Sequence, residues 1–187
     1  PVDKSRWEMT PQTVNAYFHP EMNEIVFPAA ILQPPFFDPN GDDAKNYGAI
    51  GAVIGHEMTH GYDDQGRKYD SNGNLVDWWS EKDSELFNKK AQQIIDLYNS
   101  FTYFDKNING KLTQGENIAD LGGVKISFTA MKLAIKNGDY NKGDNNVSIF
   151  SPEQQFFLSY ATAWRNKITK EAAILRIVTD PHSPGIW

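Results

Sequence analysis

The chain contains no cysteine, and this absence excludes several kinds of site at once. Disulfide bonds, thiol nucleophiles and cysteine-ligated zinc are all ruled out. The absence does not indicate a cellular compartment, because a domain without cysteine is tolerated in both reducing and oxidising locations.

Long apolar runs and basic clusters are also absent from the sequence. The longest run without strongly polar residues is 47–55, whereas a membrane-spanning helix needs about 20 apolar residues. No basic run exceeds two residues, and 18 basic against 24 acidic residues give a net charge of −6. Because nucleic-acid binding depends on clustered Lys and Arg, we expect neither a membrane span nor a nucleic-acid partner.

The residues that are present favour one folded domain. A length of 187 residues suits a single domain, and 40% hydrophobic with 13% aromatic residues can form a sizeable core. Apolar spacing and turn residues predict short strands at 13–18 and 24–27, and helices at 46–61, from 80 to about 101, at 115–137, from 151 and from 169. The sequence therefore predicts an α+β fold that is mostly helical, with a small strand element.

Local signals mark where these helices begin, end and pack. The capping residues that we identify are Ser80 with Asp83, Ser151 with Gln154, and Thr169 at helix starts, and Gly138 at a helix end. The helix at 46–61 is rich in glycine and alanine, so we expect it to be buried with its neighbours close. The predicted apolar stripe of the helix at 115–137 is Leu121, Val124, Phe128, Met131 and Ile135.

The chemistry centres on His56-Glu57-Met58-Thr59-His60, inside the first predicted helix. Histidines at positions i and i+4 project from one helix face, so both imidazoles can reach one metal ion. Glu57 follows the first histidine and can contact a water molecule at that ion. A chain of this composition contains roughly 0.004 such motifs by chance. The alternative is a histidine pair with only a structural role.

A zinc site of this kind needs a third protein ligand and one open position. The class that places a histidine six residues after the second motif histidine is excluded, because position 66 is glycine. The remaining candidate for the third ligand is a carboxylate further along the chain. Glu116 and Asp120 are two such carboxylates, and they lie on one face of a predicted helix. One could bind the metal while the other orients a ligand imidazole. The alternative is a solvated acidic first turn, which the helix dipole favours.

Several motifs together resemble the neprilysin family of zinc metalloendopeptidases, which includes endothelin-converting enzymes and bacterial oligopeptidases. The motifs are His56-Glu-Met-Thr-His60, Gly115-Glu-Asn-Ile-Ala-Asp120, Val14-Asn-Ala-Tyr17 and His182-Ser-Pro-Gly185, in the order that the family shows. The similarity extends over nearly the whole chain. It implies a zincin-like, thermolysin-like catalytic domain over residues 1–187.

The resemblance implies one Zn²⁺ per chain, with His56, His60 and Glu116 as its ligands and Glu57 as the general base. Asp120 would hold His56, and Asp63 would hold His60. His182 would stabilise the oxyanion, and Asn15 and Ala16 would align the substrate backbone. The residues implied to line the pocket after the scissile bond are Ile31, Phe36, Val53 and Trp164. A strand bearing Asn15 could also accept a substrate peptide as an added strand.

The chain differs from the family in its extent. Family members carry a large helical domain before this segment and an Arg just after the His-Ser-Pro-Gly motif, so the chain resembles a catalytic-domain fragment. We expect hydrolysis of internal bonds in short peptides, before a bulky apolar residue. The alternatives are a zinc-binding fragment with little turnover and a non-catalytic peptide-binding module. We also expect a bacterial source and an exported or cell-envelope location; the oligomeric state stays open.

Overall fold

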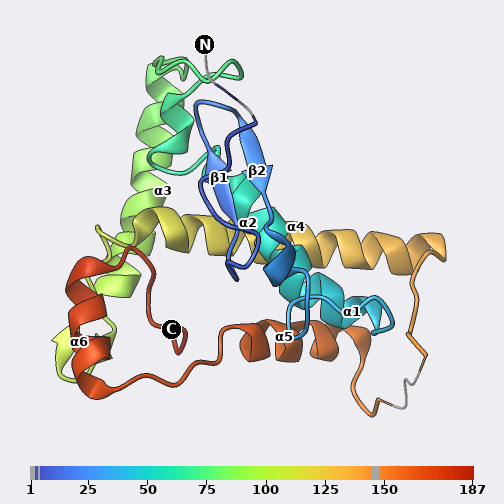
Figure 1. Ribbon diagram of the computed structural model, residues 1–187. Coiled ribbons are helices and arrows are strands. Elements are labelled where there is room, and N and C mark those ends of the chain that lie inside the picture. Colours follow the sequence, from blue (N-terminus) through green and yellow to red (C-terminus); the bar gives the residue numbers. More distant parts are fainter. Residues whose placement is uncertain (1–2, 4, 145–147) are drawn as a thin grey trace.

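The computed structural model describes residues 3, 5–144 and 148–187, and it is mostly helical (Figure 1). The α-helices are α1 (Asp43–Asn46), α2 (Ala52–His60), α3 (Glu81–Asn99), α4 (Gln114–Asn137), α5 (Pro152–Ala163) and α6 (Lys170–Thr179). Shorter turns are 3-10 at Ala29–Ile31 and Gly66–Lys68 and π at Tyr47–Gly51. The strands form two small antiparallel hairpins, β1 (Tyr17–His19) with β2 (Glu24–Val26) and β3 (Thr102–Tyr103) with β4 (Lys106–Asn107). The predicted fold class is confirmed.

The first hairpin is shorter than the sequence predicts. Tyr17 pairs with Val26 and His19 with Glu24. Residues 13–16 lie outside the strand, so the prediction of a strand over 13–18 is wrong at its start. In this register residue 15 would lie opposite Pro28, which has no N–H to donate to a sheet. The ladder therefore ends before it reaches Asn15.

The helical segment that carries the histidine motif begins earlier than predicted. It runs from α1 through the π turn into α2, and Asp42 caps its start by accepting a 2.8 Å bond from the N–H of Ala44. The π turn at Tyr47–Gly51 interrupts regular α-helical bonding, and Ser127 of α4 donates its hydroxyl to the Tyr47 carbonyl there. The Tyr47 carbonyl at the interruption is therefore hydrogen-bonded by a side chain of a neighbouring helix.

Helix α2 crosses α4 with the two backbones in close contact. A Cβ atom at Gly55 would lie 2.8 Å from the carbonyl oxygen of Gly123, and one at Gly123 would lie 2.6 Å from that of Ala52. The face of α4 that is buried carries Ala119, Gly123, Ser127 and Met131 at intervals of four residues. This packing confirms the close approach expected for the glycine-rich helix.

The predicted apolar stripe of α4 is wrong at one position. Leu121 is 62% exposed, whereas Met131 is fully buried beside Phe156 of α5. Small residues occupy the crossing with α2, because a leucine there would hold the helices apart. Val124, Phe128 and Ile135 are partly buried and pack against the cluster around Met131.

We expect Gly123→Ala to lower the free energy of unfolding by about 1–3 kcal/mol. The new Cβ would lie 2.6 Å from two backbone atoms, the Ala52 carbonyl oxygen and the His56 nitrogen, and backbone atoms cannot rotate away. Urea unfolding measures the change. Gly122→Ala is the matched control, because the three atoms nearest to its Cβ all belong to the side chain of Thr59 and none to the backbone. Equal losses in the two variants would contradict the proposed backbone contact.

The predicted helix-capping residues are confirmed. Ser80 accepts a bond from the N–H of Asp83 at the start of α3, and Ser151 with Gln154 forms a complete capping box at α5. Thr169 caps α6, and Gly138 closes α4 with a positive φ of 82°. Among the described residues, none of the helices is both long and apolar enough to cross a membrane.

Candidate metal centre and active site

Two crossing helices bring three potential ligand side chains to one point. His56 and His60 lie one turn apart on α2, with their Nε2 atoms 2.9 Å apart. Glu116 lies on the first turn of α4, and its Oε2 atom is 3.2 Å from His56 Nε2 and 3.4 Å from His60 Nε2. His56, Glu57 and His60 also form a group whose ligand atoms all lie within 4.8 Å of one another.

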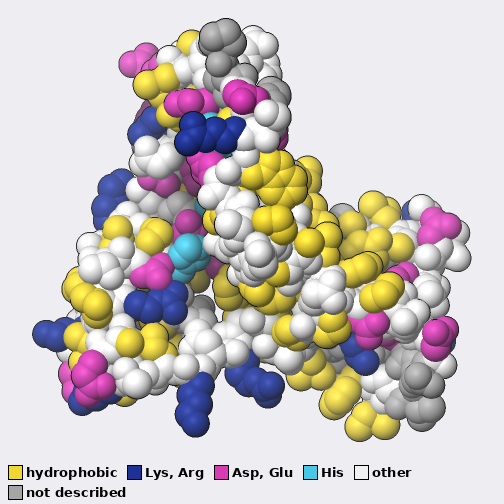
Figure 2. Space-filling model, in the orientation of Figure 1, with side chains coloured by type: hydrophobic (Ala, Val, Ile, Leu, Met, Phe, Trp, Pro, Cys, Tyr) yellow, Lys and Arg dark blue, Asp and Glu magenta, His cyan; other side chains and the backbone are white. Residues whose placement is uncertain are grey.

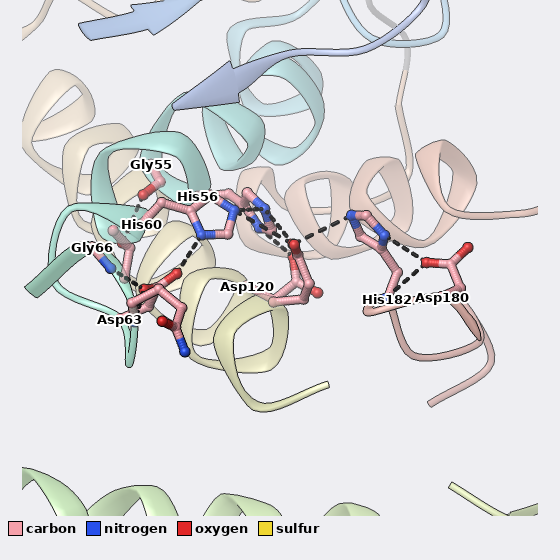
Figure 3. Close-up of polar contacts among 11 residues, drawn as sticks. Gly55, His56, His60, Asp63, Gly66, Asp120, Asp180 and His182 are labelled. Carbon is pink, nitrogen blue, oxygen red and sulfur yellow. Dashed lines mark hydrogen bonds and ion pairs between the residues drawn. The ribbon is translucent and has the colours of Figure 1, made fainter. Parts of the chain in front are cut away.

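Carboxylates fix the orientation of both imidazoles (Figure 3). His56 Nδ1 lies 2.8 Å from Asp120 Oδ1, and His60 Nδ1 lies 2.7 Å from Asp63 Oδ2. The other oxygen of Asp63 accepts the backbone N–H groups of Gln65 and Gly66. Because each Nδ1 faces a carboxylate, a neutral ring carries its hydrogen on Nδ1, and its lone pair on Nε2 then points toward the partner ligands. The structure thus places Asp120 beside His56 and Asp63 beside His60, the two pairs that the family resemblance implies.

The convergence of acceptor atoms fits a metal ion. Oε2 of Glu116 is buried and has no hydrogen-bond partner among the described residues, although imidazole nitrogens surround it. Two facing lone pairs and a carboxylate oxygen repel one another unless a cation lies among them. Two imidazoles and one carboxylate are a donor set that zinc accepts while keeping a position open. The residues therefore fit the metal that the motif predicts.

The electrostatics of the cluster favour positive charge at the same point. Burial opposes protonation of His56 and His60, but their carboxylate partners outweigh it and raise the pKa of His56 to about 9 and that of His60 to about 10. Burial alone would raise the pKa of Glu116, yet the neighbouring imidazoles of His56 and His60 lower it well below its usual range. A metal ion can supply the charge that protons otherwise provide.

Glu57 is placed to exchange protons at this centre. The residue is buried, with 5% exposure, and a carboxylate oxygen lies within 4.8 Å of a ring nitrogen of each of the two histidines. Burial is the main reason that its pKa is raised. A carboxylate with a raised pKa accepts a proton more readily near neutral pH, which is what a general base needs.

His182 reaches the centre from the loop that follows α6. Its Nε2 lies 3.3 Å from Glu116 Oε2, and its Nδ1 lies 2.8 Å from Asp180 Oδ1. Arg176 on the last turn of α6 holds the other oxygen of Asp180 at 2.7 Å. The sequence reasoning did not single out Asp180 or Arg176. The available signal was their spacing, with Arg176 four residues before Asp180 at a helix end and Asp180 two residues before His182.

A cleft of about 430 Å³ surrounds the candidate metal centre. All of the predicted substrate residues line this cleft: Asn15, Ala16, Ile31, Phe36, Val53 and Trp164. The residues of the candidate metal centre and its surroundings line it as well: His56, Glu57, His60, Glu116 and His182. In Figure 2 a histidine side chain lies beside acidic side chains at the edge of a hollow. Asn15 lies two residues before β1 and not on the strand itself, so the expected strand position of Asn15 is wrong, while the docking of a peptide along this segment stays a prediction.

We expect Asp63→Asn to weaken zinc binding by about 10–100-fold, because the amide cannot hold the His60 ring as the carboxylate does. The dissociation constant can be measured by competition with a chromogenic chelator. Asp64→Asn is the matched control, since the Asp64 carboxylate accepts hydrogen bonds from Gln65 and Gln114 rather than from either histidine. Equal zinc affinity in wild type and Asp63→Asn would contradict the orienting role of Asp63.

The similarity to known proteins extends over the whole chain. The model of peptidase family M13 matches residues 15–187. An endothelin-converting enzyme homologue of Locusta migratoria is 49% identical over 98% of this chain, and neprilysin-11 of Caenorhabditis elegans is 48% identical over 100%. The inhibitor-bound zinc metalloprotease Zmp1 of Mycobacterium tuberculosis is 48% identical over 99% of this chain and 29% of its own, with a TM-score of 0.90.

The likeness covers only part of each relative. The chain spans 25% of the locust protein and 22% of neprilysin-11. Within that part, the agreement in fold confirms the zincin-like architecture that the motifs imply. Because the family model matches almost all of the sequence, this chain belongs to peptidase family M13, as its resemblance to neprilysin and the endothelin-converting enzymes predicts.

Proposed function

We propose that the protein is a zinc-dependent endopeptidase and that residues 1–187 form its catalytic domain. The observation that carries the proposal is the convergence of His56, His60 and Glu116, with the buried carboxylate of Glu57 beside them. Membership of peptidase family M13 and the likeness to a zinc metalloprotease support it. The chain spans about a quarter of the length of the locust relative, so the activity of the whole protein is part of this proposal.

His56, His60 and Glu116 would hold one zinc ion per chain. When bound, zinc would supply the Lewis acidity that makes a water molecule a nucleophile near neutral pH. Glu57 would accept the proton of the attacking water and pass it to the amine that leaves. Its burial keeps that proton from being lost to bulk solvent during the transfer.

His182 would stabilise the negative charge that develops on the scissile carbonyl oxygen. Asp180 holds its Nδ1, so a protonated His182 presents the Nε2–H group toward the centre. Its side chain is 46% exposed, and the ring therefore faces the open cleft and not the core. Loss of one donor of this kind typically lowers the rate by about 10²–10³-fold.

The cleft supports a preference for peptides with a bulky apolar residue after the scissile bond. Ile31 and Val53 are buried in a cluster with Ala16, and Phe36 packs against it. These side chains give one part of the cleft an apolar wall. Asn15 lies at the cleft with a polar side chain that could bond to the peptide backbone.

Quenched fluorescent peptides that differ only in the residue after the scissile bond test this function. We expect cleavage before Phe or Leu to exceed cleavage before Asp by at least about 10-fold, because burying an unpaired charge in an apolar pocket is unfavourable. Removal of zinc by a chelator should abolish cleavage, and added zinc should restore it. Cleavage that continues without metal would contradict the proposal, and bound zinc without any cleavage would favour a non-catalytic zinc-binding module.

A further inference from the structure

A chain of three hydrogen bonds joins the C-terminal loop to the start of α4. The Ser183 hydroxyl donates to Asn117 Oδ1 at 2.8 Å, and Asn117 Nδ2 donates to Thr113 Oγ1 at 2.9 Å. The Thr113 hydroxyl in turn donates to the Asn109 carbonyl at 3.2 Å. Because Thr113 uses its hydrogen on Asn109, it accepts from the Asn117 amide, and this fixes the amide oxygen toward Ser183.

The two ends of this chain adjoin the two groups that meet at the candidate metal centre. Asn117 follows Glu116 on the first turn of α4, and it is 3% exposed. Ser183 follows His182 in the loop, and His182 Nε2 lies 3.3 Å from Glu116 Oε2. Neighbouring residues are joined by a rigid peptide unit, so the bond between Asn117 and Ser183 constrains the distance between Glu116 and His182.

Burial does little to hold His182 itself. Its side chain is 46% exposed, against 17% for Glu116. Three other contacts hold this loop: Asp180 is bound by Arg176, Gly185 lies against the backbone of Trp164, and Trp187 stacks on Phe101 with the ring centroids 4.6 Å apart. None of these three contacts involves a residue of α4.

We infer that Asn117 and Ser183 are positioning residues that hold the His182 loop against α4 and so set His182 relative to Glu116. The inference rests on the proposed function, in which His182 acts on the scissile carbonyl oxygen. A misplacement of about 1 Å at a reacting centre can lower a rate by about 10²-fold. The side chains of Asn117 and Ser183 touch neither substrate nor metal in this role.

The hydrogen bonds can be tested without any activity. Amide hydrogen exchange of the non-proline residues of 182–187 should quicken by roughly 5-fold in Ser183→Ala and Asn117→Ala, as expected for the loss of one hydrogen bond. Ser183→Thr keeps a hydroxyl and should restore the slow exchange. The matched control is Ser159→Ala, which removes a hydroxyl bond of the same 2.8 Å length to the Lys45 carbonyl, away from the cleft. Unchanged exchange in both test variants would overturn the inference.

A double-mutant cycle with His182→Ala then tests the role. In the protein that has His182, Ser183→Ala should lower kcat by about 10-fold with KM and zinc content unchanged. In the His182→Ala background the same substitution should change kcat by less than about 2-fold, because the group that it positions is gone. A purely structural role would lower kcat equally in both backgrounds, and that result would overturn the inference.

Failure of the proposed function and failure of the positioning role give different experimental results. If the wild-type protein binds no zinc or cleaves no peptide, the proposed function fails, and the hydrogen-exchange comparison alone decides whether Asn117 and Ser183 hold the loop. If the wild type cleaves peptides and the cycle is additive, the proposed function stands and the positioning role is wrong.

Discussion

Replacing Glu57 with Gln is expected to lower peptide turnover by at least about 10²-fold while the zinc stays bound. Glutamine has the size and shape of glutamate, so it fits the buried site, where Glu57 is 5% exposed. Its amide cannot accept a proton from the attacking water. The metal ligands His56, His60 and Glu116 are untouched, and elemental analysis should therefore find the same zinc content.

The measurement compares kcat for one quenched peptide in wild type and Glu57→Gln at equal zinc occupancy. A peptide inhibitor should bind the two proteins with similar affinity, because binding does not need the proton transfer. Glu171→Gln, on the exposed first turn of α6, is the matched control and should leave kcat unchanged. Substantial turnover in zinc-loaded Glu57→Gln would show that another group activates the water.

Helix ends could be predicted from the sequence because capping is local. The hydroxyls of Ser80, Ser151 and Thr169 each accept a bond from an N–H three residues on, and Gly138 takes a positive φ at the end of α4. Such bonds depend on a few neighbouring residues, which the sequence displays directly. Tertiary contacts do not have to be known for them.

Features that depend on partners far along the chain could not be predicted. The start of β1 is limited by Pro28, two residues after the opposite strand ends, and the exposure of Leu121 is set by the contact of Gly123 with α2. The π turn before α2 has its partner in Ser127, 80 residues after Tyr47. Local pattern suggested a strand over 13–18 and a buried Leu121, and the tertiary packing overrode both.

In the candidate site, too, some features follow from local sequence and others depend on tertiary contacts. The spacing of His56 and His60 fixes two facing imidazoles once the segment is helical, and the spacing of Glu116 and Asp120 places two carboxylates on one face of α4. The convergence of α2 with α4 is a tertiary contact; the family resemblance implies the ligand set His56, His60 and Glu116 but not the helix packing that brings these residues together. The bond between Asn117 and Ser183 joins residues 66 positions apart, with nothing in the local sequence to indicate it.

Glu116→Ala is expected to weaken zinc binding by more than about 100-fold, which is the upper end for residues that only orient a ligand. The substitution removes one of three proposed ligands and leaves the two histidines, so the site loses both a bond and the only negative charge of its donor set. The fold should survive, because alanine suits a helix and an acidic residue in a first turn contributes only about 0.3–1 kcal/mol.

Comparing the zinc affinities of Glu116→Ala and Asp120→Ala distinguishes a metal ligand from a residue that only orients one, because both side chains lie on the same face of α4. Asp120 contacts Nδ1 of His56 and not the converging Nε2 atoms, so its loss should weaken zinc binding by only about 10–100-fold. Competition with a chromogenic chelator gives both dissociation constants under one set of conditions. Glu116 has the buried oxygen that lacks a hydrogen-bond partner among the described residues, and this is why the larger loss is expected there. If Asp120→Ala loses zinc more completely than Glu116→Ala, the two carboxylates have the opposite roles.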